Sequence, residues 1–201
     1  MTMIDDNLQQ VKARIAQAAK ACQRDASAVR LLAVSKTFPA QAVREAYAAG
    51  QTAFGENYIQ EGVDKIAALA DLPLEWHCIG PIQSNKTRLV AEHFDWVHSV
   101  DRLKIAQRLS DQRPAGLAPL QLCIQVNIDG GPNKAGVTPE DALELARQIK
   151  VLPRLQLRGL MTIPEPAPDF AAACAVHPPI WACCATPRHT HRRAWKSPLR
   201  T

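Results

Sequence analysis

Long apolar runs are missing from this chain of 201 residues. No stretch approaches the roughly 18 apolar residues that a membrane-spanning helix needs. Residues 1–6 carry acids where a secretion signal would carry basic residues, and no apolar segment follows them. These absences predict a cytoplasmic protein that has no membrane partner.

The six cysteines lack the spacing of a metal site, since no two of them are separated by two residues as in C-x2-C. In the cytoplasm such thiols stay reduced and pack as small hydrophobic side chains. We therefore expect neither a metal centre nor a disulfide framework.

Acidic residues are absent from residues 178–201, and all 19 of them precede that segment. Five basic residues fall within it, so they account for the whole formal net charge of +5. The balanced charge of residues 1–177 leaves no basic stripe for nucleic acid. Because the segment also lacks glycine and any regular period, we expect a domain over residues 1–177 and an irregular basic tail over residues 178–201.

Strand and helix patterns alternate along most of the chain. An amphipathic helix over residues 4–22 comes first, and six strand–helix pairs follow it. This alternation predicts right-handed βαβ units and a parallel sheet, as an open doubly wound sheet or as a closed (β/α)8 barrel. The strands are expected at 31–35, 52–55, 75–79, 96–100, 120–128 and 155–163, and the helices at 39–49, 57–70, 84–93 (with Ser84 as its cap), 101–112, 138–150 and 169–177.

Lys36 follows the first expected strand directly. In parallel α/β proteins, functional side chains gather at the carboxyl ends of strands. An amine at the partly dry opening formed by these strand ends has its charged form disfavoured. The unprotonated amine attacks an aldehyde to form a Schiff base. The position by itself is also that of an ordinary solvated lysine at the start of a βα loop, so both interpretations stay open.

Polar side chains end other expected strands and are predicted to face the same opening. Asn57 can hydrogen-bond a phenolic oxygen of a bound cofactor, and His77 can pack against the ring of that cofactor. Asn57 also fits a helix N-cap, and His77 also fits a core histidine with satisfied ring nitrogens. The segments concerned are Gly55-Glu56-Asn57, His77 to Gly80, Asn127 and Met161-Thr162.

Four segments of the sequence resemble one known family. They are AVSKT at 33–37, FGENY at 54–58, WHCIGPIQSNK at 76–86 and RGLMTI at 158–163. They occur in order at the expected strand ends, and the likeness extends from about residue 5 to residue 177. On these segments the chain resembles the pyridoxal 5′-phosphate (PLP) homeostasis protein family.

The resemblance implies a (β/α)8 TIM-barrel-like domain of the alanine racemase N-terminal type, with an extra N-terminal helix and about six βα units present. It implies that Lys36 holds PLP as a Schiff base, and we expect Asn57, His77 and Met161 to be further cofactor contacts. We expect a monomeric, non-catalytic carrier in intracellular PLP homeostasis that supplies PLP-accepting enzymes. The alternative is a PLP-dependent racemase or lyase, which would need a second acid/base group opposite the lysine.

The sequence departs from the family pattern after residue 177. The resemblance implies two further βα units there, with an S-x-G-M-S turn and an R-I-G-x-x-x-F-G segment that grip the PLP phosphate. Neither string occurs in this chain. We therefore predict weak PLP retention. We interpret residues 178–201 as the product of a shifted reading frame or of a joined sequence, which the gene's other two frames would test.

Overall fold

The computed structural model describes residues 3–131 and 134–175, and within them six parallel strands form one sheet in the order β1 to β6. The predicted tail over residues 178–201 lies outside the described residues. The elements are α1 (Met3–Ala21), η1 (Ala26–Ala28), β1 (Ala33–Val34), α2 (Ala40–Ala48), β2 (Ala53–Glu56), α3 (Ile59–Ala68), β3 (Glu75–Cys78), η2 (Ser84–Lys86), α4 (Thr87–His93), β4 (Trp96–Val100), α5 (Leu103–Gln112), β5 (Leu120–Gln125), α6 (Pro139–Lys150), β6 (Leu155–Met161) and α7 (Phe170–Ala175).

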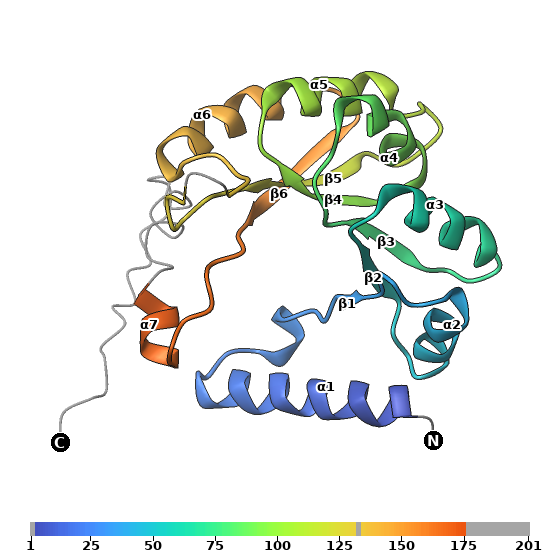
Figure 1. The fold of residues 1–201 in the computed structure, drawn as a ribbon, viewed down its shortest axis with the longest axis vertical. Coiled ribbons are helices and arrows are strands. Elements are labelled where there is room, and N and C mark those ends of the chain that lie inside the picture. Colours follow the sequence, from blue (N-terminus) through green and yellow to red (C-terminus); the bar gives the residue numbers. More distant parts are fainter. Residues whose placement is uncertain (1–2, 132–133, 176–201) are drawn as a thin grey trace.

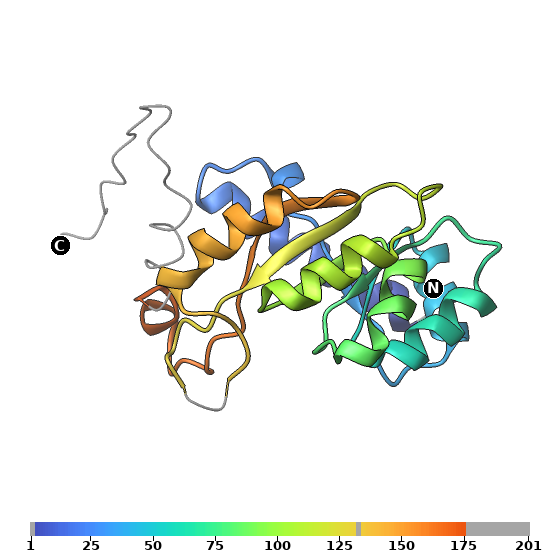
Figure 2. The same cartoon turned by 90° about the horizontal axis from the view of Figure 1, so that it is seen from above.

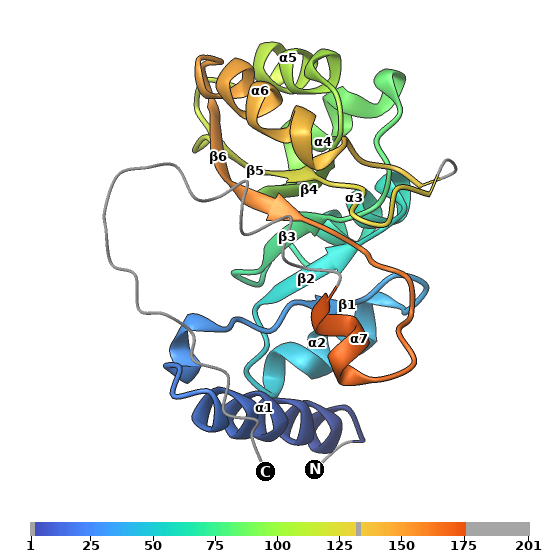
Figure 3. The ribbon, with the colours of Figure 1, turned by 90° about the vertical axis from the view of Figure 1, so that its left-hand side faces the viewer.

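The sheet curves into an arc with α2 to α6 on its convex side (Figure 1). Seen from above, α5 and α6 run side by side in this outer layer (Figure 2). A doubly wound sheet would carry helices on both faces and reverse its strand order, whereas these strands follow one another in chain order (Figure 3). The described fold is therefore the barrel type, with six successive βα units.

Helix α1 packs against α2, beside the edge strand β1 (Figure 1). Ile4 and Leu8 contact the hydrophobic core, and Asp5 and Asp6 lie in the first turn, where the helix dipole favours negative charge. The predicted N-terminal amphipathic helix is confirmed. Among the described helices, none is both long and apolar enough to cross a membrane.

The core lies between the sheet and its helices. In strand β5, for example, Leu120, Leu122 and Ile124 point toward the helices and are fully buried. Gln121 and Gln125 alternate with them on the opposite, inner face and are only half-buried. A period of two in side-chain direction thus places apolar residues under the helices and polar residues inside the arc.

Several details of the predicted elements are wrong. Strand β5 ends at Gln125 and strand β6 at Met161, before the predicted ends at residues 128 and 163. The first strand covers only Ala33–Val34, since β1 pairs with β2 alone in the described sheet and the Leu31 carbonyl accepts a hydrogen bond from the side chain of Gln51. Ser84 does not cap a helix with its hydroxyl. It begins the 3-10 turn η2, and its carbonyl oxygen accepts a hydrogen bond from the Thr87 hydroxyl at the start of α4.

Candidate functional site

Lys36 lies at the carboxyl end of β1, as the sequence predicted. The chain stays in the sheet up to Ser35, whose N–H donates to the Gly55 carbonyl at 3.0 Å. The Lys36 side chain is exposed, and its amine has no hydrogen-bond partner among the described residues. The expected partly dry surroundings are therefore wrong for the described residues. The reason is that β1, as an edge strand, has a neighbouring strand on one side only.

A tight turn presents Lys36. The Phe38 N–H closes it by donating to the Ser35 carbonyl at 3.1 Å. Thr37 occupies the left-handed region with φ 66°. A β-branched residue rarely adopts this conformation, which costs on the order of 1–3 kcal/mol and persists only where surrounding contacts hold it. The Thr37 hydroxyl donates to the Lys36 carbonyl at 2.6 Å, which is one such contact.

A buried ion-pair network supplies the other contacts that hold this turn. The Lys65 amine on α3 donates to the Ser35 carbonyl at 2.6 Å, to Glu56 Oε1 at 2.8 Å and to Glu61 Oε1 at 2.7 Å. The Lys65 and Glu56 side chains are only 6% and 0% exposed. The Ser35 hydroxyl also donates to Glu56 Oε1, at 2.6 Å. Buried charges of this kind persist only when they are paired and hydrogen-bonded.

Glu61 joins this network to the far side of the turn. Its Oε1 accepts a hydrogen bond from the Thr37 N–H at 2.7 Å as well as the one from Lys65. The hydrogen bond from Lys65 is the main reason that the pKa of Glu61 is lowered, and so this carboxylate stays charged at neutral pH. Both peptide neighbours of Lys36 are therefore held by one set of charges.

Asn57 follows the last residue of β2 and is half-buried. The N-cap residue of α3 is Tyr58, which makes no side-chain cap hydrogen bond, so Asn57 is not a helix cap. Its side-chain amide has no partner among the described residues and is free to contact a ligand. The Asn57 carbonyl lies against Gly80, where an added Cβ would approach that oxygen to 2.1 Å. Glycine at residue 80 thus lets the chain segments after β2 and β3 meet.

His77 lies inside the arc in a chain of polar contacts. Its Nε2 is 2.7 Å from Glu75 Oε1, and its Nδ1 is 2.8 Å from His98 Nε2. Glu75 Oε1 in turn accepts a hydrogen bond from Arg30 at 2.6 Å. Because a carboxylate only accepts, His77 donates from Nε2 and, when both rings are neutral, accepts at Nδ1 from His98. Packing is thus the only contact that the His77 ring can still offer to a ligand.

The two imidazoles are held in their neutral forms. Burial lowers the pKa of His77, and burial together with the adjacent His77 lowers the pKa of His98 to about 4. The His77 ring stacks on Trp96, with centroids 5.3 Å apart and planes at 14°. The Arg158 guanidinium lies 5.6 Å from the centre of the Trp96 ring. These side chains form a layer inside the arc.

Two buried polar atoms follow β5 and β6 and have no hydrogen-bond partner among the described residues. They are Asn127 Oδ1 and Thr162 Oγ1. Thr162 directly follows Met161, which ends β6 and is half-buried. Leaving such an atom unpaired costs about 1–3 kcal/mol, which a ligand's hydrogen bond would recover. Since all six strands are parallel, these atoms lie at the same end of the sheet as Lys36.

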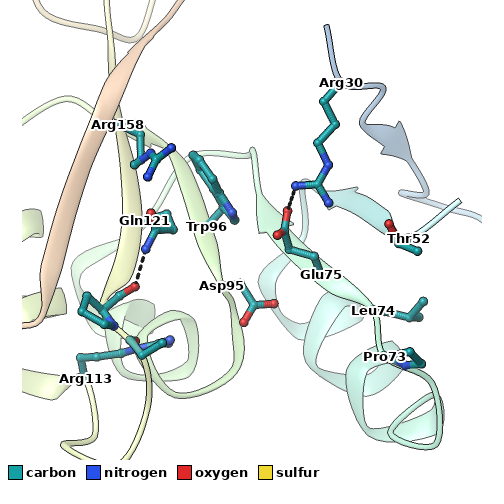
Figure 4. Close-up of a pocket in the computed structure, with 12 residues that line it drawn as sticks. Arg30, Thr52, Pro73, Leu74, Glu75, Asp95, Trp96, Arg113, Gln121 and Arg158 are labelled. Carbon is teal, nitrogen blue, oxygen red and sulfur yellow. Dashed lines mark hydrogen bonds and ion pairs between the residues drawn. The ribbon is translucent and has the colours of Figure 1, made fainter. Parts of the chain in front are cut away.

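A cavity of about 720 Å³ opens at the opposite end of the sheet, where the strands begin (Figure 4). The Arg30–Glu75 ion pair lines one side, and Trp96 and Arg158 line the other (Figure 4). Functional side chains of barrel proteins come from the carboxyl ends of the strands, whereas the amino ends serve stability. The candidate site is therefore the end that carries Lys36.

Comparisons with known proteins agree with this fold. The sequence profile of the alanine racemase N-terminal domain matches residues 7–177. Alanine racemase from E. faecalis has a TM-score of 0.63 at 17% identity, over 86% of this chain and 48% of that one, and this likeness concerns the fold alone. The fold and the lysine at its first strand end define a barrel domain of the alanine racemase N-terminal class.

Nearer relatives identify the family. The pyridoxal phosphate homeostasis protein of Pseudomonas aeruginosa is 64% identical over 172 residues, which cover 86% of this chain and 75% of that protein. The Escherichia coli protein of the same name is 56% identical over 173 residues, 85% of this chain and 74% of that one. PipY of Synechococcus elongatus, solved with PLP bound, has a TM-score of 0.71 at 41% identity, over 84% and 79% of the two chains. The chain belongs to the pyridoxal phosphate homeostasis protein family.

The residues at the carboxyl ends of the strands fit PLP. The amine of Lys36 and the amide of Asn57, which have no hydrogen-bond partner among the described residues, suit its aldehyde and its phenolic oxygen. The unpaired Asn127 Oδ1 and Thr162 Oγ1 offer an acceptor and a hydroxyl for further polar contacts.

The network behind the turn was missed in the sequence. Glu56 was expected to face the opening, but it follows Phe54 in alternation and points toward α3, where it pairs with Lys65. Lys65 was not singled out in the sequence. The one signal was the spacing of four between Glu61 and Lys65, which places the two side chains together on a helix face.

Proposed function

We propose that this chain binds PLP through Lys36 and acts as a non-catalytic carrier in PLP homeostasis. The observation that supports it most is the free amine of Lys36, held in a constrained turn at the carboxyl end of β1. The aldehyde of PLP condenses with such an amine, with loss of water, to give a covalent imine. The family membership supports the same function.

The remaining cofactor contacts follow from their places at the strand ends. Asn57 hydrogen-bonds the phenolic oxygen, because its amide is free. His77 packs against the ring and makes no new hydrogen bond, because both its nitrogens already have protein partners. Met161 adds an apolar contact at the end of β6.

Borohydride trapping tests this proposal. One equivalent of PLP is added to the protein, the imine is reduced, and peptide mapping locates the label. We expect the label on the peptide that contains Lys36. The Lys36→Ala variant should lose the label from that peptide, and Lys104→Ala, which changes an exposed lysine on α5, should leave it in place.

A label spread evenly over exposed lysines would refute Lys36 as the PLP-binding residue. Continuous turnover of amino acids by the PLP-loaded protein would instead favour the racemase or lyase alternative. Dialysis of PLP-loaded protein that has not been reduced tests retention, because the sequence-based prediction of weak binding requires the imine absorbance to fall during dialysis.

Three further expectations stay predictions. We propose PLP-accepting enzymes as recipients, which activation of a PLP-free enzyme by the loaded carrier would test. We propose a monomer, which sedimentation would test. We propose a cytoplasmic location, where the buried free thiols of Cys78 and Cys123 stay reduced, and cell fractionation would test it.

A further inference from the structure

The ion-pair network touches the residues on both sides of Lys36 and leaves Lys36 itself free. Lys65 holds the carbonyl of Ser35, the residue before it. Glu61 holds the N–H of Thr37, the residue after it. The middle residue of this arrangement is the exposed amine that the proposed function uses.

Thr37 shows that the turn needs to be held. Its φ of 66° is unfavourable for a β-branched side chain, and a glycine would adopt it without strain. The turn closes through a single backbone hydrogen bond, from Phe38 to Ser35. Without the contact to Glu61, Thr37 would relax toward negative φ, and the peptide that carries Lys36 would rotate with it.

We propose that Glu61, Lys65 and Glu56 are positioning residues for Lys36, and that they hold the strained turn in the one conformation that presents its amine to the aldehyde. This inference rests on the proposed function. The three residues act through the backbone of the turn and do not contact the cofactor. Glu56 is fully buried and anchors Lys65, and Lys65 in turn anchors Glu61.

Substitution of Glu61 can change the position of Lys36 without unfolding the protein. Its side chain is 30% exposed, so removing it leaves no large cavity, and Lys65 keeps its pair with Glu56. Glu61→Ala removes the acceptor of the Thr37 N–H, and Glu61→Gln keeps a side-chain oxygen that can accept it. Asp64→Ala is the matched control, because Asp64 lies on the same helix, is exposed and contacts only Gln60 by hydrogen bond.

Two measurements report on the conformation of the turn. The first is amide hydrogen exchange of Thr37 in PLP-free protein, and the second is the rate at which borohydride-trapped PLP accumulates on Lys36. For Glu61→Ala we expect about tenfold faster exchange and about tenfold slower labelling, since a hydrogen bond to a charged group is lost. Glu61→Gln should recover most of both values, and Asp64→Ala should match the wild type.

The double variant with Glu61→Ala and Thr37→Gly tests the strain directly. Glycine tolerates positive φ, so it should recover part of the labelling rate, whatever the thermal stability of the single variant. Wild-type labelling in Glu61→Ala would overturn the proposal, and so would an equal loss in Asp64→Ala. Absence of label on Lys36 in the wild type would refute the proposed function itself, whereas normal wild-type labelling with unchanged variants refutes only the positioning.

Discussion

Acid is expected to weaken the fold through the pair of His77 and His98. The two rings share one hydrogen bond of 2.8 Å inside the arc, and this bond requires an unprotonated nitrogen on one of them. Burial and the neighbouring ring lower the pKa of His98 to about 4 in the folded protein, from a usual value of 6.5. An unfolded chain has no such burial, so its His98 takes up a proton at a higher pH.

The sign of the effect follows from proton uptake. Above about pH 6.5 both states of His98 are neutral, so the group does not make the unfolding free energy depend on pH. Between there and about pH 4 only the unfolded state gains the proton, and falling pH lowers the unfolding free energy. With a folded pKa of about 4, the loss reaches about 2–3 kcal/mol at about pH 4.5.

Urea unfolding at a series of pH values measures this loss. Carboxylates also titrate in acid, so the comparison is between the wild type and His98→Gln. The glutamine amide can donate to His77 Nδ1, as His98 does, but it does not titrate. We expect the variant to lose about 2–3 kcal/mol less than the wild type between about pH 7 and pH 4.5. His93→Gln is the control, because His93 is an exposed histidine at the end of α4.

Parallel acid curves for wild type and His98→Gln would refute this reasoning. An NMR titration of His98 with an ordinary midpoint would refute it independently, since burial would then not lower the pKa of this ring.

Two substitutions test the packing around the site. Lys65→Met should lower the unfolding free energy by about 3–5 kcal/mol, because it leaves the charge of Glu56 buried without its partner, and a loss under about 1 kcal/mol in urea unfolding would contradict this. Gly80→Ala should cost about 1–3 kcal/mol, because the new Cβ would lie 2.1 Å from the Asn57 carbonyl oxygen. Gly116→Ala is its control, since nothing lies within 4 Å of that position, and equal melting temperatures for the two alanine variants would show that the close approach relaxes freely.

Element order was accessible from sequence because it depends on local patterns. Six apolar runs alternate with amphipathic stretches, and each was found as a strand followed by a helix. The length of β1 was overestimated because strand length depends on the neighbouring strands, which the local pattern does not contain. Ser84 illustrates the same limit, since the 3-10 turn at its position replaced the expected cap.

The side of the sheet that each residue faces was less accessible. Lys36 was placed correctly at a strand end, because a strand end can be read from where the apolar run stops. Met161 ends β6 two residues before the predicted end of that strand at residue 163. Glu56 was placed on the wrong side, because a shift of one residue in a strand reverses every side chain. The pairing of His77 with His98 joins residues 21 positions apart, and it depends on the register between β3 and β4.

The sequence by itself determined the order of the strand–helix units and the lysine at the first strand end, and its motifs indicated the family and, through that resemblance, the barrel class. These depend on periodicity and on short motifs, which one chain carries along its length. Only the tertiary structure decided that Glu56, Glu61 and Lys65 converge behind Lys36 and that Thr37 is strained. The physical reason is that a buried charge needs an oppositely charged partner, and these partners come together only when β1, β2 and α3 have packed.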